Sequence, residues 1–188
     1  MTAQWLDRVG DWNPQLFREL KGRLTKRSAL LTVLVTLVGQ FLLGSLMFES
    51  EHDPVPLFQT LNWLLPLLLF VPGTGLLMND LEQEERRGTL NFIRLSPQSS
   101  QSILLGKLLG VPILLYLSAA LLLPMHVWAT LAAHVSPSFL VSFYSLLGVA
   151  CAFIFSLATL FAFVGRFTTG QTHAPTSALS LVTALLVG

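Results

Sequence analysis

Charged side chains are scarce in this sequence: 11% of its 188 residues are Asp, Glu, Lys or Arg, whereas an ordinary soluble domain carries about 25%. Hydrophobic residues make up 53% of the chain, and the mean hydropathy is +0.67. So few charges cannot cover a surface that faces water. Their scarcity excludes a soluble globular domain and indicates a protein embedded in a lipid bilayer.

Cysteine is almost absent too, because Cys151 is the only one. A single cysteine excludes disulfide frameworks and cysteine-based zinc sites, and its apolar surroundings are typical of a small buried hydrophobe. The net charge is only +1, so the sequence provides no basic face for nucleic acid. We therefore expect no nucleic-acid partner.

The charges that are present fall into clusters, and the gaps between the clusters are long enough for membrane helices. We predict an all-α, polytopic membrane helix bundle with four complete spans, at about 29–48, 57–78, 103–131 and 139–165. A further apolar stretch at 174–188 has about 15 residues where a span needs about 20, which predicts a truncated fifth helix. Pro66 and Pro72 are expected to kink or interrupt the second span.

The N-terminal region, residues 1–28, combines six cations with a helix-start signal. Asn13 can cap free backbone amides, and Pro14 at the first helical position has no donor to leave unpaired. Three leucines and a phenylalanine between 16 and 24 then share one face, which predicts an amphipathic interfacial helix lying along the membrane surface. The residues expected at the membrane interface are Trp12, Phe17, Arg18, Lys21, Arg23, Lys26 and Arg27.

The distribution of Lys and Arg predicts the orientation of the bundle. All eleven lie in residues 1–28, in residues 80–107 or at Arg166, which the four spans place on one side. The opposite loops, 49–56 and 132–138, carry none. The positive-inside rule therefore predicts a multi-pass protein of the plasma membrane with its N-terminus in the cytoplasm.

Small residues at helical spacing indicate packing faces, because helices in lipid approach one another most closely at small side chains. Two rows occur at spacings of four: Gly106 with Gly110, and Gly148 with Ala152 and Ser156.

Polar residues also share a face of the first span, namely Thr32, Thr36 and Gln40. An amide in lipid needs a partner, so we expect this face to look into the bundle. Two interpretations stay open for it: the polar lining of a substrate path, and plain interhelical hydrogen bonding. His126 and Trp128, near the outer end of the third span, are interpreted as membrane-interface residues.

The loop at 79–102 is the most informative segment. Glu82 precedes Arg86 by four residues, an order that favours a short helix, and Gly88 can end that helix. Apolar residues at 90–95 then follow in an otherwise aqueous loop. This layout is typical of a docking element at the cytoplasmic surface, and a solvated connector without a partner is the plain alternative.

The chain resembles the permease subunit of bacterial ABC transporters of the type-2 exporter class. The likeness consists of the N-terminal helix, two spans, the run Glu85-Arg86-Arg87-Gly88-Thr89-Leu90, and then Leu95-Ser96-Pro97 and Leu105-Gly106-Lys107. It implies a cytoplasmic coupling helix in the loop that sits in a groove of a separate ABC ATPase subunit, and a second permease half in a homo- or heterodimer. The residues that it places against the ATPase are Glu84, Glu85, Arg86, Arg87, Gly88, Thr89 and Leu90. The family usually has six spans, whereas this sequence supplies four and part of a fifth.

Two other classes of protein remain as alternatives: a structural or regulatory membrane subunit that docks a cytoplasmic partner, and an intramembrane hydrolase. A metalloprotease needs two histidines on one helix face, but the four histidines are scattered, so no metal site is expected. The phosphate-binding pattern is incomplete around Gly106 and Lys107, so we expect ATP hydrolysis on another polypeptide and neither a cofactor nor enzymatic activity in this chain.

Overall fold

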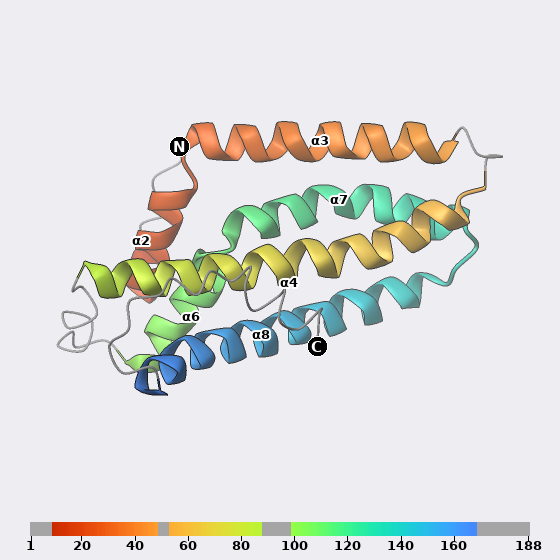
Figure 1. Cartoon of the computed structure of the whole chain (residues 1–188). Helices are drawn as coiled ribbons and strands as arrows, with labels where there is room; N and C mark the ends of the chain where they lie inside the picture. The colour runs from red at the N-terminus through yellow and green to blue at the C-terminus, as the bar shows by residue number, and fades with distance from the viewer. Residues whose placement is uncertain (1–8, 49–52, 88–98, 169–188) are drawn as a thin grey trace.

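The computed structural model of the chain describes residues 9–48, 53–87 and 99–168, and every regular element in these ranges is a helix (Figure 1). The predicted all-α fold class is therefore confirmed. The principal helices are α2 (Pro14–Arg23), α3 (Lys26–Phe48), α4 (Val55–Arg86), α6 (Ser100–Gly110), α7 (Ile113–Ala132) and α8 (Pro137–Thr168). The fifth helix expected at 174–188 lies outside the described residues.

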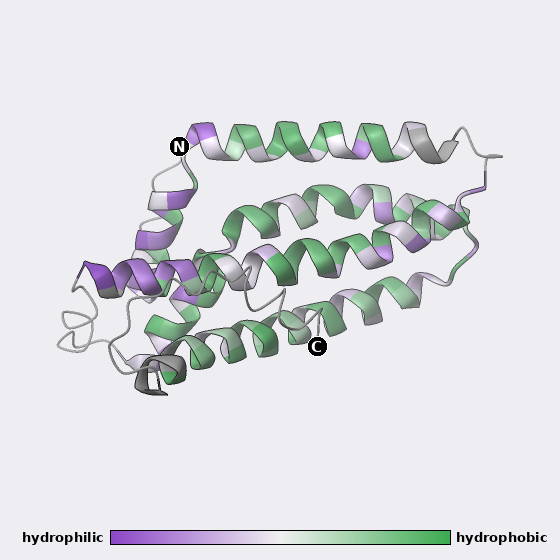
Figure 2. Cartoon of the chain, in the orientation of Figure 1, coloured by the Kyte–Doolittle hydropathy of each residue, from purple (hydrophilic) through white to green (hydrophobic). Residues whose placement is uncertain are grey.

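Within the described part of the chain, four helices are long and apolar enough to cross a membrane: α3, α4, α7 and α8. They lie alongside one another in Figure 1. Figure 2 shows that hydrophilic residues gather at one end of this bundle, in α2 and in the last turns of α4. We call this the charged end. The chain therefore has the character of a membrane-embedded protein.

Helix α4 is longer than the predicted second span. The sequence predicted a span at 57–78 that Pro66 and Pro72 kink or interrupt, followed by a separate loop, but one helix of 32 residues runs through both prolines to Arg86. Proline is tolerated in membrane helices because neighbouring helices support the freed backbone groups. At about 1.5 Å per residue, α4 is roughly 48 Å long, which exceeds the 30 Å of hydrocarbon that a bilayer offers.

One row of residues on α4 is buried along most of the length of the helix. Leucines recur at every fourth residue from Leu57 to Leu81 and are buried, and Gly73 takes the place of a leucine within this row. Phe155 of α8 fills that gap and has no exposed surface. A Cβ atom on Gly73 would lie 2.5 Å from the Phe155 Cζ atom. The glycine therefore permits the close approach of α4 and α8.

The predicted third span, 103–131, is wrong as a single helix. The chain forms α6 and α7, with a turn at Val111 and Pro112 between them. Pro112 has no backbone N–H to donate into α6, so the helical hydrogen bonds of α6 end at Val111, whose N–H donates to the Lys107 carbonyl at 2.9 Å. The Pro112 carbonyl accepts from Tyr116 N at 3.1 Å, at the start of α7. The break lets α6 leave the axis of α7 and pack beside α2 at the charged end (Figure 1).

The core of the bundle lies between α4, α7 and α8. His126 is part of this interior: its side chain is fully buried, its Nδ1 atom is 3.0 Å from the Tyr144 hydroxyl, and its ring packs edge to face with Phe143 and tilted against Phe58. Its interpretation as an interface residue is therefore wrong, because three helices enclose it. Trp128, by contrast, keeps 46% of its surface exposed.

The small residue row on α8 does not pack within the chain. Gly148 and Ala152 are exposed, and nothing lies within 4 Å of a Cβ atom built on Gly148. Gly148 therefore offers a control for Gly73, because it also lies within a membrane-spanning helix but has no close neighbour.

Gly73→Ala is expected to lower the melting temperature of the chain in detergent, because the new Cβ atom would press on the buried Phe155 ring. Overpacking of this kind costs about 1–3 kcal/mol. Gly148→Ala should leave the melting temperature unchanged or raise it slightly, since alanine is the better helix former and has room there. Equal melting temperatures for the two variants would contradict the close packing of α4 on α8.

Candidate functional site

Helix α2 begins where the sequence predicted. The Asn13 side chain caps the helix by accepting from Leu16 N at 3.0 Å, and Pro14 occupies the first helical position. The Asn13 amide also donates to the Ser102 carbonyl at 2.8 Å, which ties the start of α2 to α6. One side chain thus fixes both the start of the helix and its position.

The apolar face of α2 packs on the protein itself. Leu16 and Leu20 are 8% and 7% exposed, and α6 covers them. The sequence predicted that this face lies along the membrane surface, whereas these two leucines are buried against a helix of the same chain. Trp12 on the outer side keeps 66% of its surface exposed.

Gly106 and Gly110 make the contact between α2 and α6 possible. A Cβ atom on Gly106 would lie 2.9 Å from Leu16 N, which is a backbone atom that cannot turn aside. A Cβ atom on Gly110 would overlap the Cβ atom of Glu19. The close contact expected from the spacing of these glycines is therefore present, but the partner helix is α2 and not another span.

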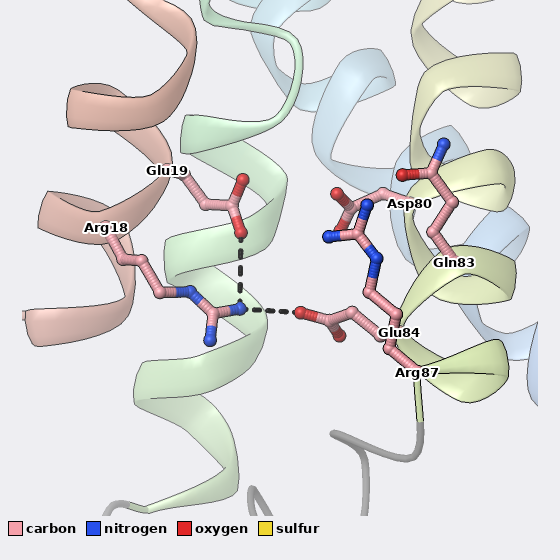
Figure 3. Close-up of a pocket in the computed structure, with 6 residues that line it drawn as sticks. All are labelled: Arg18, Glu19, Asp80, Gln83, Glu84 and Arg87. Carbon is pink, nitrogen blue, oxygen red and sulfur yellow. Dashed lines mark hydrogen bonds and ion pairs between the residues drawn. The ribbon is translucent and has the colours of Figure 1, made fainter.

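Six charged side chains meet where α2, α6 and the end of α4 come together. Figure 3 draws Arg18, Glu19, Asp80 and Glu84 among them. We call this group the ion cluster; its carboxylates are Glu19, Asp80 and Glu84, and its cations are Arg18, Arg23 and Lys107. Lys107 Nζ lies 2.6 Å from Asp80 Oδ2 and 2.8 Å from Glu84 Oε2. It therefore bridges two carboxylates that stand one turn apart on α4.

Helix α2 contributes the other two cations. Arg18 Nη2 lies 2.6 Å from Glu84 Oε1, and Arg23 Nη2 lies 2.5 Å from Asp80 Oδ1. Glu19 accepts from Arg23 Nε at 3.1 Å and from the Gln15 amide at 3.1 Å. The three cations and three carboxylates balance, and each carboxylate of α4 has one partner on α2 and one on α6.

Most of the ion cluster is withdrawn from water. The side chain of Lys107 is 5% exposed, that of Glu84 is 10% exposed and that of Asp80 is 15% exposed, whereas Arg18 keeps 54%. Taking an ion out of water costs several kcal/mol, which only good pairing offsets. Any displacement of α2 or α6 from α4 would leave a buried charge without its partner, so the ion cluster fixes the relative position of the three helices.

The three carboxylates are close enough to share a divalent cation, because one oxygen of each lies within 4.8 Å of the others. Oxygen ligands of this kind suit Mg²⁺ or Ca²⁺. However, Arg18, Arg23 and Lys107 already occupy the same carboxylates. A metal ion would have to displace these three cations, which join the carboxylates of α4 to α2 and α6.

A cavity of about 340 Å³ adjoins the ion cluster. Its lining consists of Arg18, Glu19, Asp80, Gln83, Glu84 and Arg87, which Figure 3 shows as sticks. The cavity therefore opens between α2 and the last turns of α4, next to the start of the predicted docking segment.

The structure distributes the residues predicted for ATPase contact over different environments. Glu84 lies in the ion cluster, Arg86 is exposed, and Arg87 is exposed at the rim of the cavity. The Glu85 side chain and residues 88–90, which are Gly88, Thr89 and Leu90, lie outside the described residues.

The residues predicted for the membrane interface also separate into two groups. Arg18 and Arg23 face the ion cluster, whereas the cations Lys21, Lys26 and Arg27 are exposed. The ammonium of Lys21 stands 5.7 Å from the centre of the half-buried Phe17 ring.

The polar face of the first span meets α7. Thr36 Oγ1 donates to Ser118 Oγ at 3.2 Å, and the Gln40 amide donates to the Leu121 carbonyl at 2.8 Å. Thr32, one turn before Thr36, is half-buried. The hydrogen bonds between helices that the sequence left as one interpretation are thus present at two of these three residues.

The sequence reasoning did not single out Glu19, Asp80 or Lys107. Two signals pointed to them: Asp80 and Glu84 are four residues apart, and Lys107 stands alone among apolar residues and glycines. A lysine in such surroundings needs a carboxylate partner.

Comparisons of the chain with models of protein families, with curated proteins and with solved structures found no match. The functional interpretation therefore rests on the sequence and on the geometry of the charged end.

Lys107→Met is expected to destabilise the chain by about 3–5 kcal/mol, because Asp80 and Glu84 would be left buried without their shared cation. Lys26→Met is the matched control: Lys26 is exposed, and a surface substitution changes stability by less than about 0.5 kcal/mol. Denaturant titration of both variants in detergent measures the difference. A Lys107→Met variant as stable as the control would show that the ion cluster does not hold these helices together.

Proposed function

We propose that this chain is the membrane-spanning permease subunit of an ATP-driven export system of the ABC transporter class. A separate ATPase subunit binds the segment that follows α4, and a second permease half completes the assembly. The observation that carries the proposal is the continuity of α4, which extends from the membrane-spanning region to Arg86, where that segment begins.

A continuous helix suits the transmission of force. The ATPase acts on residues at the charged end of α4, and a rigid helix carries the displacement through both prolines into the bundle. The ion cluster makes α2 and α6 follow, because separating them from α4 would leave buried charges without their partners. ATP hydrolysis on the ATPase subunit thereby displaces the spans, and the proposal assigns no catalytic residue to this chain.

The proposal assigns fewer residues to ATPase contact than the sequence predicted. Glu84 belongs to the joint between helices, since both of its carboxylate oxygens face cations of this chain. The exposed Arg86 and Arg87, together with the residues that follow them, form the docking surface.

In this proposal the charged end lies on the cytoplasmic side of the plasma membrane. The positive-inside rule favours this orientation, because the described Lys and Arg residues of α2, of the start of α3, of the end of α4 and of α6 lie at this end. The exposed Lys21, Lys26 and Arg27 are available to anionic lipid, at about 1 kcal/mol for each cation near the surface.

Arg86→Glu combined with Arg87→Glu is expected to reduce capture of an ATPase subunit encoded next to this chain, because negatively charged carboxylates would replace the exposed cations of the docking surface. Lys26→Glu combined with Arg27→Glu is the matched control, with the same charge change at another exposed pair of the charged end. Co-purification from membranes measures capture. Undiminished capture by the first variant would overturn the docking assignment.

The same complex separates the transporter from a structural or regulatory subunit. In a transporter, ATP must change the arrangement of the spans, which pulsed spin-label distances between the two permease halves can follow in lipid nanodiscs. Capture of the ATPase without any ATP-dependent change in these distances would favour the regulatory subunit.

A further inference from the structure

Helix α3 packs on α7 but lies outside the hydrophobic core. The hydrophobic core draws its residues from α4, α6, α7, α8 and the turn at Val111, and none of the described residues of α3 belongs to it. None of the residues in the membrane-spanning window of α3 is buried, compared with 28% in α4 and 22% in α7 and in α8. Figure 1 shows α3 at the edge of the bundle, alongside α7.

Two polar contacts connect the middle of α3 to α7. They are the bond from Thr36 to Ser118 and the bond from Gln40 to the Leu121 carbonyl. Hydrogen bonds between membrane helices are weak on average, because the separated helices find other partners. Apolar packing adds little here, since lipid tails solvate the exposed leucines and valines of α3 as well as a neighbouring helix does.

The charged end holds α3 more firmly, through α2. Only Leu24 and Thr25 separate the two helices. Ser28 closes this turn: its hydroxyl donates to the Arg23 carbonyl at 2.5 Å, and its backbone N–H donates to Thr25 Oγ1 at 3.2 Å. Arg23, the last residue of α2, is also the one that pairs with Asp80 of α4.

We propose that α2 and α3 form a single arm, that the ion cluster sets its position, and that α3 is the span that moves relative to α7 when the charged end of α4 is displaced. This deepens the proposed function by naming the moving span. The anchor at Arg23 lies at one end of the arm and the weak contacts with α7 lie along its length, so a small shift of α4 at Asp80 separates α3 from α7 while α4, α7 and α8 stay packed.

Spin-label distances in the chain alone test this proposal, in nanodiscs and without any ATPase. Cys151→Ala removes the native thiol, and labels replace exposed residues: Val35 with Leu123 reports on α3 and α7, and Leu67 with Val149 reports on α4 and α8. The perturbation is Arg23→Gln, which leaves Asp80 paired with Lys107. The control is Arg27→Gln, an exposed cation that is not part of the ion cluster.

We expect Arg23→Gln to shift or broaden the distance distribution between α3 and α7 and to leave that between α4 and α8 unchanged, while Arg27→Gln changes neither. An unchanged distribution between α3 and α7 would overturn the proposal. Equal changes in both pairs would also overturn it, because α3 would then not move independently of the core.

Cysteine cross-linking provides a second readout in native membranes. Thr36→Cys with Ser118→Cys, again with Cys151→Ala, places two thiols where hydroxyls now lie 3.2 Å apart. The proposal expects slower disulfide formation with Arg23→Gln than with Arg27→Gln, and equal rates would contradict it. If only the inference about α3 is wrong, the Arg86 and Arg87 variant still reduces ATPase capture. If the proposed function is wrong, that variant captures the ATPase as well as its control does.

Discussion

The ammonium group of Lys107 places the strongest physical constraint on this structure. It is buried in a chain that has few charges, and it lies between Asp80 and Glu84 of another helix. Burying an ammonium group costs several kcal/mol, which close carboxylate partners offset. The position of α6 against α4 is therefore fixed, and the arginines of α2 that pair with the same carboxylates fix α2 as well.

Two kinds of interaction thus divide the molecule. Apolar packing joins α4, α7 and α8, where Phe155 fits against Gly73 and the aromatic rings of Phe58 and Phe143 enclose His126. Charge pairing joins α2, α6 and the end of α4. Helix α3 belongs to neither group directly, because it contributes nothing to the core and reaches the ion cluster only through α2. This division leads to the proposed transfer of motion from the charged end to a peripheral span.

The sequence predicted the elements whose signals are local. Long charge-free stretches predicted helices of membrane length, and Asn13 with Pro14 predicted the start of α2. Proline was a poorer guide to where helices end: Pro66, Pro72 and Pro124 lie inside helices, whereas Pro112 lies in the turn between α6 and α7. In a membrane protein the neighbouring helices decide which proline interrupts a helix, and here α6 leaves the axis of α7 to contact α2 through Gly106 and Gly110.

The candidate site was hidden for a different reason. Arg18 and Glu84 are 66 residues apart in the chain, and Lys107 is 27 residues from Asp80. No local pattern connects such residues, so the sequence predicts ATPase contact for Glu84 and a membrane-interface position for Arg18, and not their pairing. Residues 88–98 of the predicted docking loop, 79–102, lie outside the described residues, so this part of the loop stays a prediction from the sequence.

We expect Lys107 and the carboxylates of α4 to be energetically coupled, and a double-mutant cycle measures their coupling free energy. Unfolding free energies of Lys107→Met, Asp80→Asn and the double variant are compared with the unchanged chain in detergent. We predict a coupling free energy above about 1 kcal/mol, with the double variant more stable than the two single losses imply. If the loss of unfolding free energy in the double variant equals the sum of the two single losses to within about 0.5 kcal/mol, the two side chains are independent and Lys107 does not hold α6 against α4.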